Sequence, residues 1–554
     1  PVTRNGKVDK RALPEINVTL IREYVAPRND MERILCEAFA EILNVDRVGI
    51  NDNFMELGGD SIKAIRIISK LRNLGYSINV REIMLYKNVE RIAGAIKEEV
   101  REKEYNQGEV AGKVCKTPII KAFDSWKLRK PEHFNQAMMF TVDNIPNDVI
   151  QEALCELVKH HDILRAVYNN EEMQIRDIGD GRLFDWYEFN YTDILNKAEV
   201  VDKKCSEIQA SMDLANGPLV KAAVFELGKE KIMMLCIHHL AVDGVSWRIL
   251  SDDFETATNQ ILSKNEVTLP RKTASYIEWA EALKNMSESG VYESDRRYWN
   301  EIRGQVDSCH LYTDKAANST YEAGNIDVTV DEEITGKLIY DAGSAYNTEI
   351  NDLLLSALVK AFSTWNSIAR ISVNLEGHGR DEEIVGLKVD NTVGWFTNTY
   401  PVVLNAEDDM GKLIVSVKEM LRNVPNKGFT YGILCEDDAV KADISFNYLG
   451  QLDDVSDCIN YTTGGSVASE NVIPGIINFN GSVMNKKLVF NIEYNRCMFS
   501  NLQMQKLADC FADAIKDIVS YCVNKDETVQ TISDLSDDNL NDEEMDIINE
   551  LFDF

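Results

Sequence analysis

The spacing of apolar residues changes at about residue 117, and this change constrains the fold most strongly. Before it, apolar side chains recur at helical spacing, as in 34–43 and in the segment that begins at Asp60–Ser61. After it, segments of strand character such as 231–237 alternate with helical ones. Alternation of strands and helices is typical of an α/β fold. We therefore expect a small all-α domain followed by a larger α/β domain.

Composition limits the classes of partner and the cellular location. The 554 residues suggest several domains, and the formal net charge of −32 argues against nucleic acid and membrane as partners. Eleven cysteines without a CxxC pair, and no apolar run of membrane-spanning length, predict reduced thiols in the cytoplasm. The start, PVTRNGKVDK, lacks an apolar signal core and a methionine, so we expect a piece of a longer polypeptide.

Ser61 follows Gly58, Gly59 and Asp60 at the expected start of a helix. Glycines let the backbone turn tightly, and a helix start offers free N–H groups that suit a phosphate ester. No histidine occurs in residues 1–132 and the chain has no GxSxG motif, so Ser61 has no local base and is a poor hydrolase nucleophile. Two interpretations remain open from these residues, a plain helix N-cap and a serine that carries a phosphate ester.

Two motifs near Ser61 carry a family resemblance. The stretch DNFMELGGDSIKAIRI (52–67) resembles the phosphopantetheine attachment site of peptidyl carrier proteins from nonribosomal peptide synthetases. This implies phosphopantetheine on Ser61, attached by a phosphopantetheinyl transferase. NGKVDKRALP (5–14) resembles the closing motif of an adenylation domain, with Lys7 at the place of that family's catalytic lysine, and implies an adenylation domain upstream. The form GGDS is similar to carriers that serve epimerization domains.

In the larger domain, CIHHLAVDGVSWRIL (236–250) places His238 and His239 directly after an apolar strand. Consecutive side chains of an extended segment point opposite ways, so we expect only one of the two histidines to face a cleft. The run His-His-x-x-x-Asp-Gly resembles the signature of the condensation and epimerization superfamily. The resemblance implies that His239 is catalytic, while His238 and Asp243 structure the loop.

A second histidine pair, His160 and His161, lies in KHHDILRAVY (159–168). It resembles a structural motif of the same superfamily, and we interpret both histidines as structural. The family pattern also implies that Arg165, in the same stretch, pairs with Asp243 and so structures the catalytic loop.

NLEGHGRDEE (374–383) distinguishes between the branches of this superfamily. Glu376 directly follows the expected strand 371–375, where a lone carboxylate beside glycine is often only a turn residue. EGHGR, however, resembles an epimerization-domain motif in which the glutamate supports or performs proton transfer, and condensation domains generally lack it. SFNYLGQ (445–451) resembles a motif that makes Asn447 and Tyr448 active-site neighbours, although Tyr448 taken alone would be a core residue.

Further resemblances follow in order along the chain, namely HFNQAMM (133–139), DNTVGWFTNTYPVVL (390–404) and VPNKGFTYGIL (424–434). One departure is TPIIKAF (117–123), where these domains usually have TPIQ followed closely by a tryptophan.

Together the resemblances imply a carrier domain of four helices joined to an epimerization domain of two chloramphenicol-acetyltransferase-like lobes. His239 would come from the first lobe and Glu376 from the second. The expected organisation is an adenylation remnant (1–24), the carrier domain (25–101), a linker (102–116), the two lobes (117–298 and 299–530) and an acidic tail (531–554).

The implied reaction inverts the Cα of an L-aminoacyl or peptidyl thioester held on the chain's own carrier domain, in the biosynthesis of peptide antibiotics and other secondary metabolites. No metal cluster, nucleotide loop or pyridoxal-lysine site is evident in the sequence, so we expect phosphopantetheine to be the cofactor. The next partner would be the condensation domain of a downstream module. The residues do not name the amino acid, because the adenylation pocket that selects it is missing.

Two other functions stay open. The domain could be a condensation domain in which His239 assists an attacking amine, or a degenerate domain that only docks carriers. The GVSW ending of the histidine motif and EGHGR favour epimerization over the first alternative, and intact His239 and Glu376 favour it over the second. The acidic tail is interpreted as a docking helix or a severed linker, with an apolar stripe at Met545, Ile548, Leu551 and Phe552.

Overall fold

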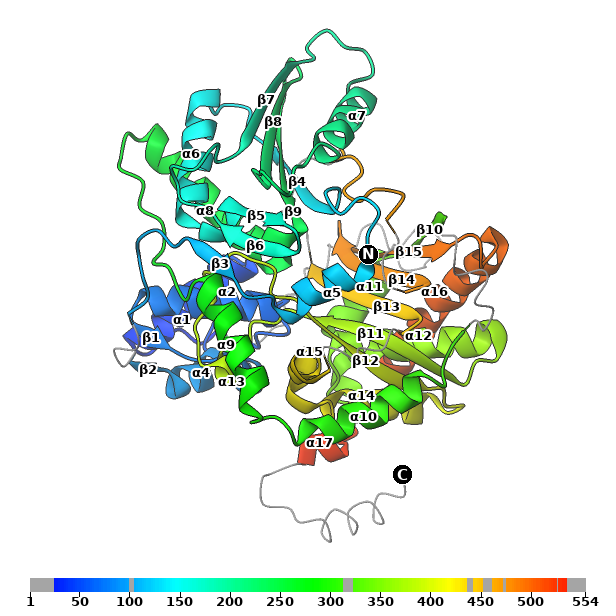
Figure 1. Cartoon of the computed structure of the whole chain (residues 1–554). Coiled ribbons are helices and arrows are strands. Elements are labelled where there is room, and N and C mark those ends of the chain that lie inside the picture. The colour runs from blue at the N-terminus through cyan, green and yellow to red at the C-terminus, as the bar shows by residue number, and fades with distance from the viewer. Residues whose placement is uncertain are drawn as a thin grey trace, which may run out of the picture. The chain divides into compact units, whose positions relative to one another are not determined.

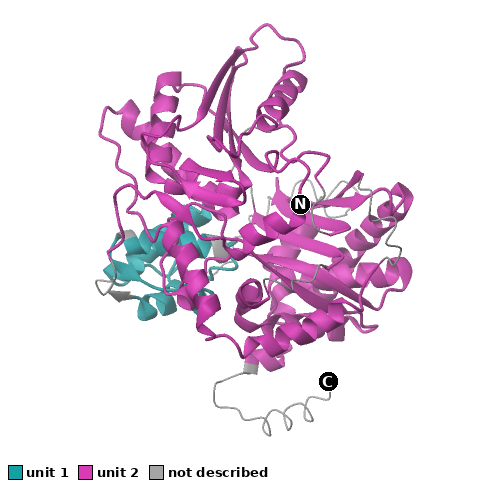
Figure 2. Cartoon of the chain, in the orientation of Figure 1, with its two compact units in different colours: residues 1–102 teal, residues 103–554 magenta. Residues whose placement is uncertain are grey.

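The chain forms two compact units, residues 1–102 and 103–554, shown in two colours in Figure 2. The structure is a computed structural model, and it describes residues 24–98, 104–311, 322–435, 442–451, 461–471, 475–525 and 527–535. The first unit is helical and the second is α/β with mixed sheets, so the predicted fold class is confirmed (Figure 1).

Four helices enclose the apolar core of the first unit: α1 (Asp30–Leu43), α2 (Ser61–Asn73), α3 (Val80–Tyr86) and α4 (Val89–Ala95). Helix α1 begins where the Asn29 side chain accepts a hydrogen bond from the backbone N–H of Glu32, at 2.8 Å. The sequence also predicts a last helix over about 88–102, and the helix in the structure is shorter. It ends at Ala95 because the strand β2 (Lys97–Glu98) pairs antiparallel with β1 (Tyr76–Ser77).

The loop before Ser61 is fixed from both sides. Gly58 has a φ of 82°, a conformation that favours glycine, and a Cβ added at Gly59 would lie 2.5 Å from the carbonyl oxygen of Phe54. The helical spacing of the apolar residues after Ser61 predicts that Lys63 points outward, but Lys63 is buried, and its ammonium donates to the Gly58 carbonyl at 3.0 Å. This charged hydrogen bond and the glycine turn together hold the start of α2 in place.

A four-stranded sheet of order β4–β9–β8–β7 forms the centre of the first half of the second unit, which we call the N-lobe. Its strands are β4 (Asn135–Thr141), β7 (Asp185–Asn190), β8 (Val220–Glu226) and β9 (Lys231–His238). A small second sheet of order β3–β6–β5 contains β3 (Gly112–Val114), β5 (Ala166–Asn169) and β6 (Glu172–Ile175). The helices are α5 (Pro118–Trp126), α6 (Asn147–His160), α7 (Lys197–Gln209), α8 (Gly244–Leu262) and α9 (Tyr276–Ser289).

The C-lobe, which follows, is built on a six-stranded sheet of order β10–β15–β14–β13–β11–β12. Its strands are β10 (Ala323–Val330), β11 (Arg370–Gly377), β12 (Asn398–Asn405), β13 (Ile444–Gln451), β14 (Ile477–Met484) and β15 (Lys487–Asn495). Strands β11, β13 and β14 run parallel, and their apolar side chains face a core that includes α12 and α16. The helices are α10 (Asp295–Val306), α11 (Glu332–Tyr340), α12 (Ile350–Asn366), α13 (Glu382–Val385), α14 (Met410–Arg422), α15 (Phe429–Leu434), α16 (Asn501–Val523) and α17 (Ile532–Leu535).

Two segments of the C-lobe cross to the N-lobe. Between β11 and β12, five apolar side chains join the apolar core of the N-lobe: Leu387, Val389, Val393, Trp395 and Phe396. Farther along, the described segment 461–471 lies beside the start of β4, where Asn135 donates its backbone N–H to the carbonyl of Ser466 at 2.9 Å. The two lobes are therefore joined by shared core as well as by main-chain hydrogen bonds.

The ends of the second unit differ from their expected roles as linker and tail. Within the predicted linker, β3 pairs with β6, and the backbone N–H of Lys388 donates to the hydroxyl of Tyr105 at 3.0 Å. At the other end, Asp534 in α17 accepts from the ammonium of Lys418 at 2.7 Å. The adenylation-like motif and the predicted docking stripe lie outside the described residues. No helix among the described residues is long and apolar enough to cross a membrane.

We predict that Gly59→Ala destabilises the first unit by roughly 1–3 kcal/mol, because the new methyl group would overlap Phe54. Hydrogen exchange of the α1 and α2 amides in the full chain should show the loss. Gly94→Ala is the matched control, since a Cβ there meets nothing within 4 Å. It should be neutral or stabilising by up to about 1 kcal/mol. Equal protection in both variants would contradict the prediction.

Candidate active site

His238 and His239 lie where β9 ends, and they have different surroundings. His238 is fully buried, and its Nε2–H donates to the carbonyl of Pro131 at 2.8 Å, while its Nδ1 accepts the backbone N–H of Leu240 at 3.2 Å. Burial lowers the pKa of His238 to about 3, so this ring is neutral. His238 thus holds the turn, and His239 is the member of the pair that is only half-buried.

The imidazole of His239 packs against two aromatic rings that also contact each other. Phe134 stacks on it with centroids 5.2 Å apart and planes 12° apart, and Trp395 lies on it with centroids 4.4 Å apart. Desolvation by these neighbours lowers the pKa of His239 below its usual value. Nδ1 lies 2.9 Å from the carbonyl of Val242, which only accepts, so Nδ1 carries the hydrogen and Nε2 carries the lone pair. At neutral pH His239 is therefore a base.

Asp243 caps α8 and is the polar centre of the contact between the lobes. One carboxyl oxygen accepts the backbone N–H of Ser246 at 2.7 Å, and the other accepts the backbone N–H of Phe396 at 3.1 Å. The guanidinium of Arg380 donates to the same carboxylate at 3.1 Å. Arg380 also donates to the carbonyl of Thr392 at 2.6 Å, and its guanidinium lies 3.9 Å from the centroid of the Phe396 ring. Asp243 therefore connects the His239 loop to residues of the C-lobe.

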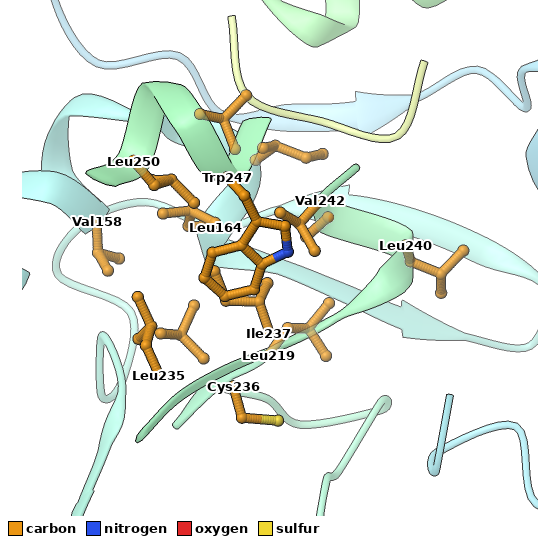
Figure 3. Packing of buried hydrophobic residues seen from close by; sticks show 14 of the residues in the cluster. Val158, Leu164, Leu219, Leu235, Cys236, Ile237, Leu240, Val242, Trp247 and Leu250 are labelled. Atoms are coloured by element: carbon orange, nitrogen blue, oxygen red, sulfur yellow. The ribbon is translucent and has the colours of Figure 1, made fainter. Parts of the chain in front are cut away.

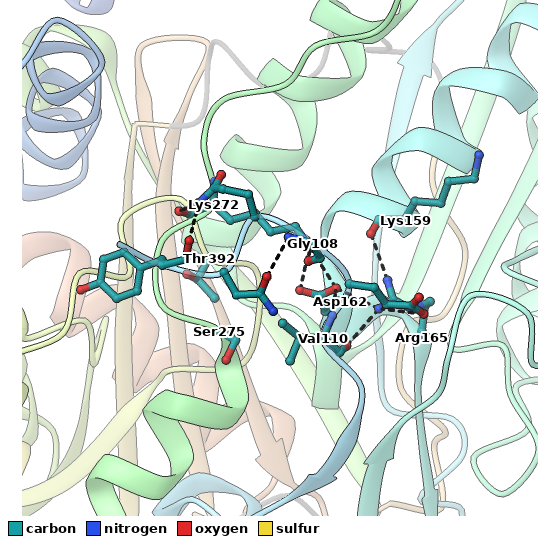
Figure 4. Close-up of polar contacts among 12 residues, drawn as sticks. Gly108, Val110, Lys159, Asp162, Arg165, Lys272, Ser275 and Thr392 are labelled. Carbon is teal, nitrogen blue, oxygen red and sulfur yellow. Dashed lines mark hydrogen bonds and ion pairs between the residues drawn. The ribbon is translucent and has the colours of Figure 1, made fainter. Parts of the chain in front are cut away.

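The predicted pairing of Arg165 with Asp243 is wrong. Arg165 forms its ion pair with Asp162, at 2.8 Å, and donates to the carbonyl of Val110 at 3.0 Å (Figure 4). It also donates to the carbonyl of Val158 at 2.9 Å. Val158 lies in the last turn of α6, whose carbonyl groups have no partner within the helix. A buried guanidinium beside this helix end satisfies those carbonyls. Arg165 therefore structures the end of α6 and the start of β5. The arginine that pairs with Asp243 is Arg380.

His160 and His161 lie at the end of α6, and the contact of His161 is internal. Its Nε2 hydrogen-bonds the buried carboxylate of Asp253 at 2.9 Å, which ties α6 to α8. Together the three side chains form the one group among the described residues whose ligand atoms are close enough to hold a metal ion, within 4.8 Å of one another. Burial lowers the pKa of His160 to about 4. These contacts agree with the structural role that we expected.

Glu376 lies on β11 of the C-lobe, next in register to Asn447 on the parallel strand β13. The amide of Asn447 donates to a carboxyl oxygen of Glu376 at 2.9 Å. The Glu376 side chain is exposed to solvent, yet the protein around it desolvates the carboxyl and raises its pKa to about 7. A carboxyl with this pKa has both protonation states near neutral pH.

Asn447 and Tyr448 point to opposite faces of the C-lobe sheet, because side chains alternate along a strand. Asn447 points toward Glu376, whereas Tyr448 packs, partly buried, against the apolar core of the C-lobe. The structure therefore brings Asn447 to Glu376 and leaves Tyr448 on the other face.

Three residues that contact this site had no role assigned from the sequence: Gln136, Trp247 and Trp395. Each lies inside a motif already quoted, HFNQAMM, GVSW and GWF. Their positions were thus visible, but the contacts of Gln136 with Trp247 and His239, and of Trp395 with His239, join segments that are far apart in the sequence.

Residues 126–541 match the Condensation domain family, and residues 33–96 match the phosphopantetheine attachment site family. The chain belongs to the condensation-domain family. A phosphopantetheine attachment domain, here called the carrier domain, precedes the condensation-type domain. The predicted resemblance to a carrier protein followed by a member of the condensation and epimerization superfamily is confirmed.

Two synthetases are similar to the whole chain. Surfactin synthase subunit 1 of Bacillus subtilis (strain 168) is 35% identical over 577 residues, which cover 100% of this chain and 16% of that protein. Gramicidin S synthase 1 of Brevibacillus brevis is 34% identical over 588 residues, which cover 100% of this chain and 53% of that protein. The chain thus spans about half or less of the length of these relatives.

Solved structures are similar to the condensation-type domain. The epimerization domain from the third module of tyrocidine synthetase B is 32% identical, with a TM-score of 0.71 over 76% of this chain and 100% of that one. The first condensation domain of the calcium-dependent antibiotic synthetase is 14% identical, with a TM-score of 0.57 over 76% of this chain and 98% of that one. The second likeness shows the fold alone.

We predict that Arg380→Met destabilises the condensation-type domain by about 3–5 kcal/mol, because it leaves Asp243 charged and unpaired in the interior. Denaturant unfolding of the full chain measures the loss. Adding Asp243→Asn to this variant should recover part of it. Arg370→Met is the matched control, an exposed arginine at the start of β11, the strand that precedes the Arg380 loop, and should change stability by less than about 0.5 kcal/mol. A cost for Arg380→Met no larger than the control would contradict the prediction.

Proposed function

We propose that the condensation-type domain epimerizes an L-aminoacyl or peptidyl group held as a thioester on the carrier domain, and gives the D-configured residue. The observation that carries this proposal is Glu376, a carboxyl with a pKa of about 7 on one lobe, in addition to the neutral base His239 on the other. The likeness to the epimerization domain of tyrocidine synthetase B supports it. An acyltransferase would need His239 but has no evident use for a second titratable group of this kind.

Inversion at Cα requires a proton to leave from one face and another to arrive on the opposite face. The thioester carbonyl makes the Cα proton acidic, because the enolate spreads its charge onto the carbonyl oxygen. In one direction, the Nε2 lone pair of His239 takes the proton and becomes imidazolium, and protonated Glu376 gives its proton to the other face and becomes carboxylate. The reverse direction starts from imidazolium and carboxylate. Each acid–base group contributes roughly 10²–10⁴-fold.

Asn447 orients Glu376 in this scheme. Its amide N–H bonds the carboxyl oxygen that it faces, and this leaves the other oxygen to hold or release the proton. The family motif implies that Tyr448 is an active-site neighbour, but its packing against the C-lobe core gives it no part in the mechanism proposed here. The enolate oxygen needs hydrogen-bond donors, for which backbone N–H groups or the imidazolium are suited.

The carrier domain would hold phosphopantetheine as a phosphate ester of Ser61. The residues present fit this group, because Ser61 opens α2 behind a glycine turn in which any larger side chain at Gly59 would overlap Phe54. When attached, the group supplies the thiol that forms the substrate thioester. We infer that a phosphopantetheinyl transferase attaches it in the cytoplasm, with an adenylation domain upstream and a condensation domain downstream, in the synthesis of an antibiotic-type peptide.

We predict that Ser61 is the attachment site. Incubation of the full chain with coenzyme A and a phosphopantetheinyl transferase should add one phosphopantetheine to the intact mass, because the helix start accommodates its phosphate. Ser61→Ala should show no added mass. Ser69→Ala, on the same helix, is the matched control and should be modified like the wild type. An adduct that persists in Ser61→Ala would refute the assignment.

We predict that a chain loaded with an L-aminoacyl group releases a D/L mixture after thioester hydrolysis, measured by chiral chromatography. Release of the L-amino acid alone would instead favour a condensation domain or a domain that only docks carriers. In heavy water, Cα should gain deuterium from either enantiomer. Glu376→Gln should lower epimerization roughly 10²–10⁴-fold and affect L and D substrates unequally. Glu383→Gln, an exposed carboxyl nearby, is the control. Wild-type exchange of both enantiomers in Glu376→Gln would exclude the two-base scheme.

We also predict a bell-shaped pH profile for the direction in which His239 is the base. The rate should rise as pH increases through the lowered pKa of His239, because the imidazole must be neutral. It should fall as pH increases through about 7, because Glu376 then loses the proton that it must donate. Initial rates of deuterium exchange from each enantiomer test this, and a rate that stays constant from pH 6 to pH 8 would contradict it.

A further inference from the structure

A chain of hydrogen bonds behind His239 involves a residue that the mechanism above does not use. Gln136 lies on β4 directly opposite Ile237 of β9, two residues before His239. Because side chains alternate along a strand, Gln136, Ile237 and His239 project from the same face of the N-lobe sheet. Trp247, in the first turns of α8, reaches Gln136 from above this face.

The polarity of this chain is fixed at both ends. The indole N–H of Trp247 donates to Oε1 of Gln136 at 2.7 Å, and Nε2 of Gln136 donates to Nε2 of His239 at 2.9 Å. At the far end, Nδ1–H of His239 donates to the carbonyl of Val242. An indole nitrogen can only donate and a carbonyl can only accept, so the Gln136 amide must present its NH₂ group to His239.

Trp247 is the rigid end of the chain. Its side chain is 5% exposed and lies among apolar residues, including Leu164, Ile237 and Leu250 (Figure 3). If the Gln136 amide turned over, it would place NH₂ against the indole N–H and leave a buried donor without an acceptor. The packing of Trp247 therefore determines which end of the Gln136 amide faces the imidazole.

We propose that Gln136, oriented by Trp247, is a positioning residue that selects the base-ready form of His239 and disfavours its imidazolium. An amide N–H directed at Nε2 stabilises a lone pair there, whereas protonation of Nε2 would set two donors against each other. The proton that His239 takes from Cα is consequently held weakly and is readily returned. This inference rests on the proposed function, in which His239 acts as a base.

The charged and titratable groups around His239 are compatible with an effect of Gln136 on its protonation. Asp243 favours the imidazolium, but its carboxylate is already paired with Arg380. His238, the neighbouring histidine, is neutral in the physiological range. The aromatic rings of Phe134 and Trp395 desolvate the imidazole and act in the same direction as Gln136.

The test observes His239 itself. Long-range ¹H–¹⁵N spectra of the full chain labelled in histidine, recorded across about pH 5 to 8, report the tautomer and the pKa, and His239→Ala assigns the signal. In the wild type, Nε2 should be unprotonated. Gln136→Glu replaces the amide with a carboxylate, which accepts hydrogen bonds from both the indole N–H of Trp247 and Nε2–H of His239. The pKa of His239 should therefore rise by about one unit or more. Gln174→Glu, an exposed glutamine on β6, should leave it unchanged.

Two further variants keep the test decisive if Gln136→Glu folds poorly. Trp247→Phe preserves the ring but removes the indole N–H, and Gln136→Leu removes the amide, so both should raise the pKa of His239 and weaken its tautomer preference. The acid limb of the deuterium-exchange profile should move to higher pH by the same amount. A wild-type signal with Nε2 protonated, or folded variants with unchanged tautomer and pKa, would overturn the proposal. If the variants show these spectral shifts but the wild type does not epimerize its substrate, only the proposed function is refuted.

Discussion

The active site depends on the buried ion pair between Asp243 and Arg380. It joins the N-lobe loop that carries His239 to the C-lobe segment that directly follows Glu376. The same guanidinium donates to the carbonyl of Thr392, in the stretch that brings Trp395 onto the imidazole. Because both partners are almost fully buried, loss of either would leave an uncompensated charge in the interior. This ion pair thus connects the two lobes, and it joins the loop that carries His239 to the stretch that places Trp395 on the imidazole.

The surroundings of His239 and Glu376 shift their pKa values in opposite directions. Desolvation penalises the charged form of any group, so it lowers the pKa of a histidine and raises that of a carboxyl. Between these two pKa values the pair consists of a neutral base and a protonated acid. This is the protonation state that the proposed stereochemical inversion needs at the start, and desolvation is the largest cause of the shift for both groups.

In the carrier domain, the fold positions the candidate site by a different physical means. Ser61, the proposed attachment site, has no histidine among the first 132 residues, and the chemistry expected of it is attachment. What the fold provides is a helix start behind a turn that only glycine fits, held by the buried ammonium of Lys63 on the Gly58 carbonyl. The sequence could not show this, because Lys63 falls on the polar side of the helical pattern.

The sequence by itself determined the fold class, because the helical and strand periodicities are local signals. It also placed His239 and Glu376 at strand ends through compact motifs, and the structure finds both there. The last carrier helix was overestimated, since its end depends on pairing between Lys97–Glu98 and a strand about twenty residues earlier.

Only the tertiary structure decided the partners of the site residues. Gln136 and His239 are 103 positions apart, and Arg380 and Asp243 are 137 apart, so no local pattern could pair them. The family pattern implied that Arg165 pairs with Asp243. In the structure, Arg165 instead donates hydrogen bonds to the carbonyls at the end of α6. The sequence determines which groups are present at the strand ends. Their protonation states and orientations depend on desolvation and on hydrogen bonds between distant segments, which exist only once the lobes are packed.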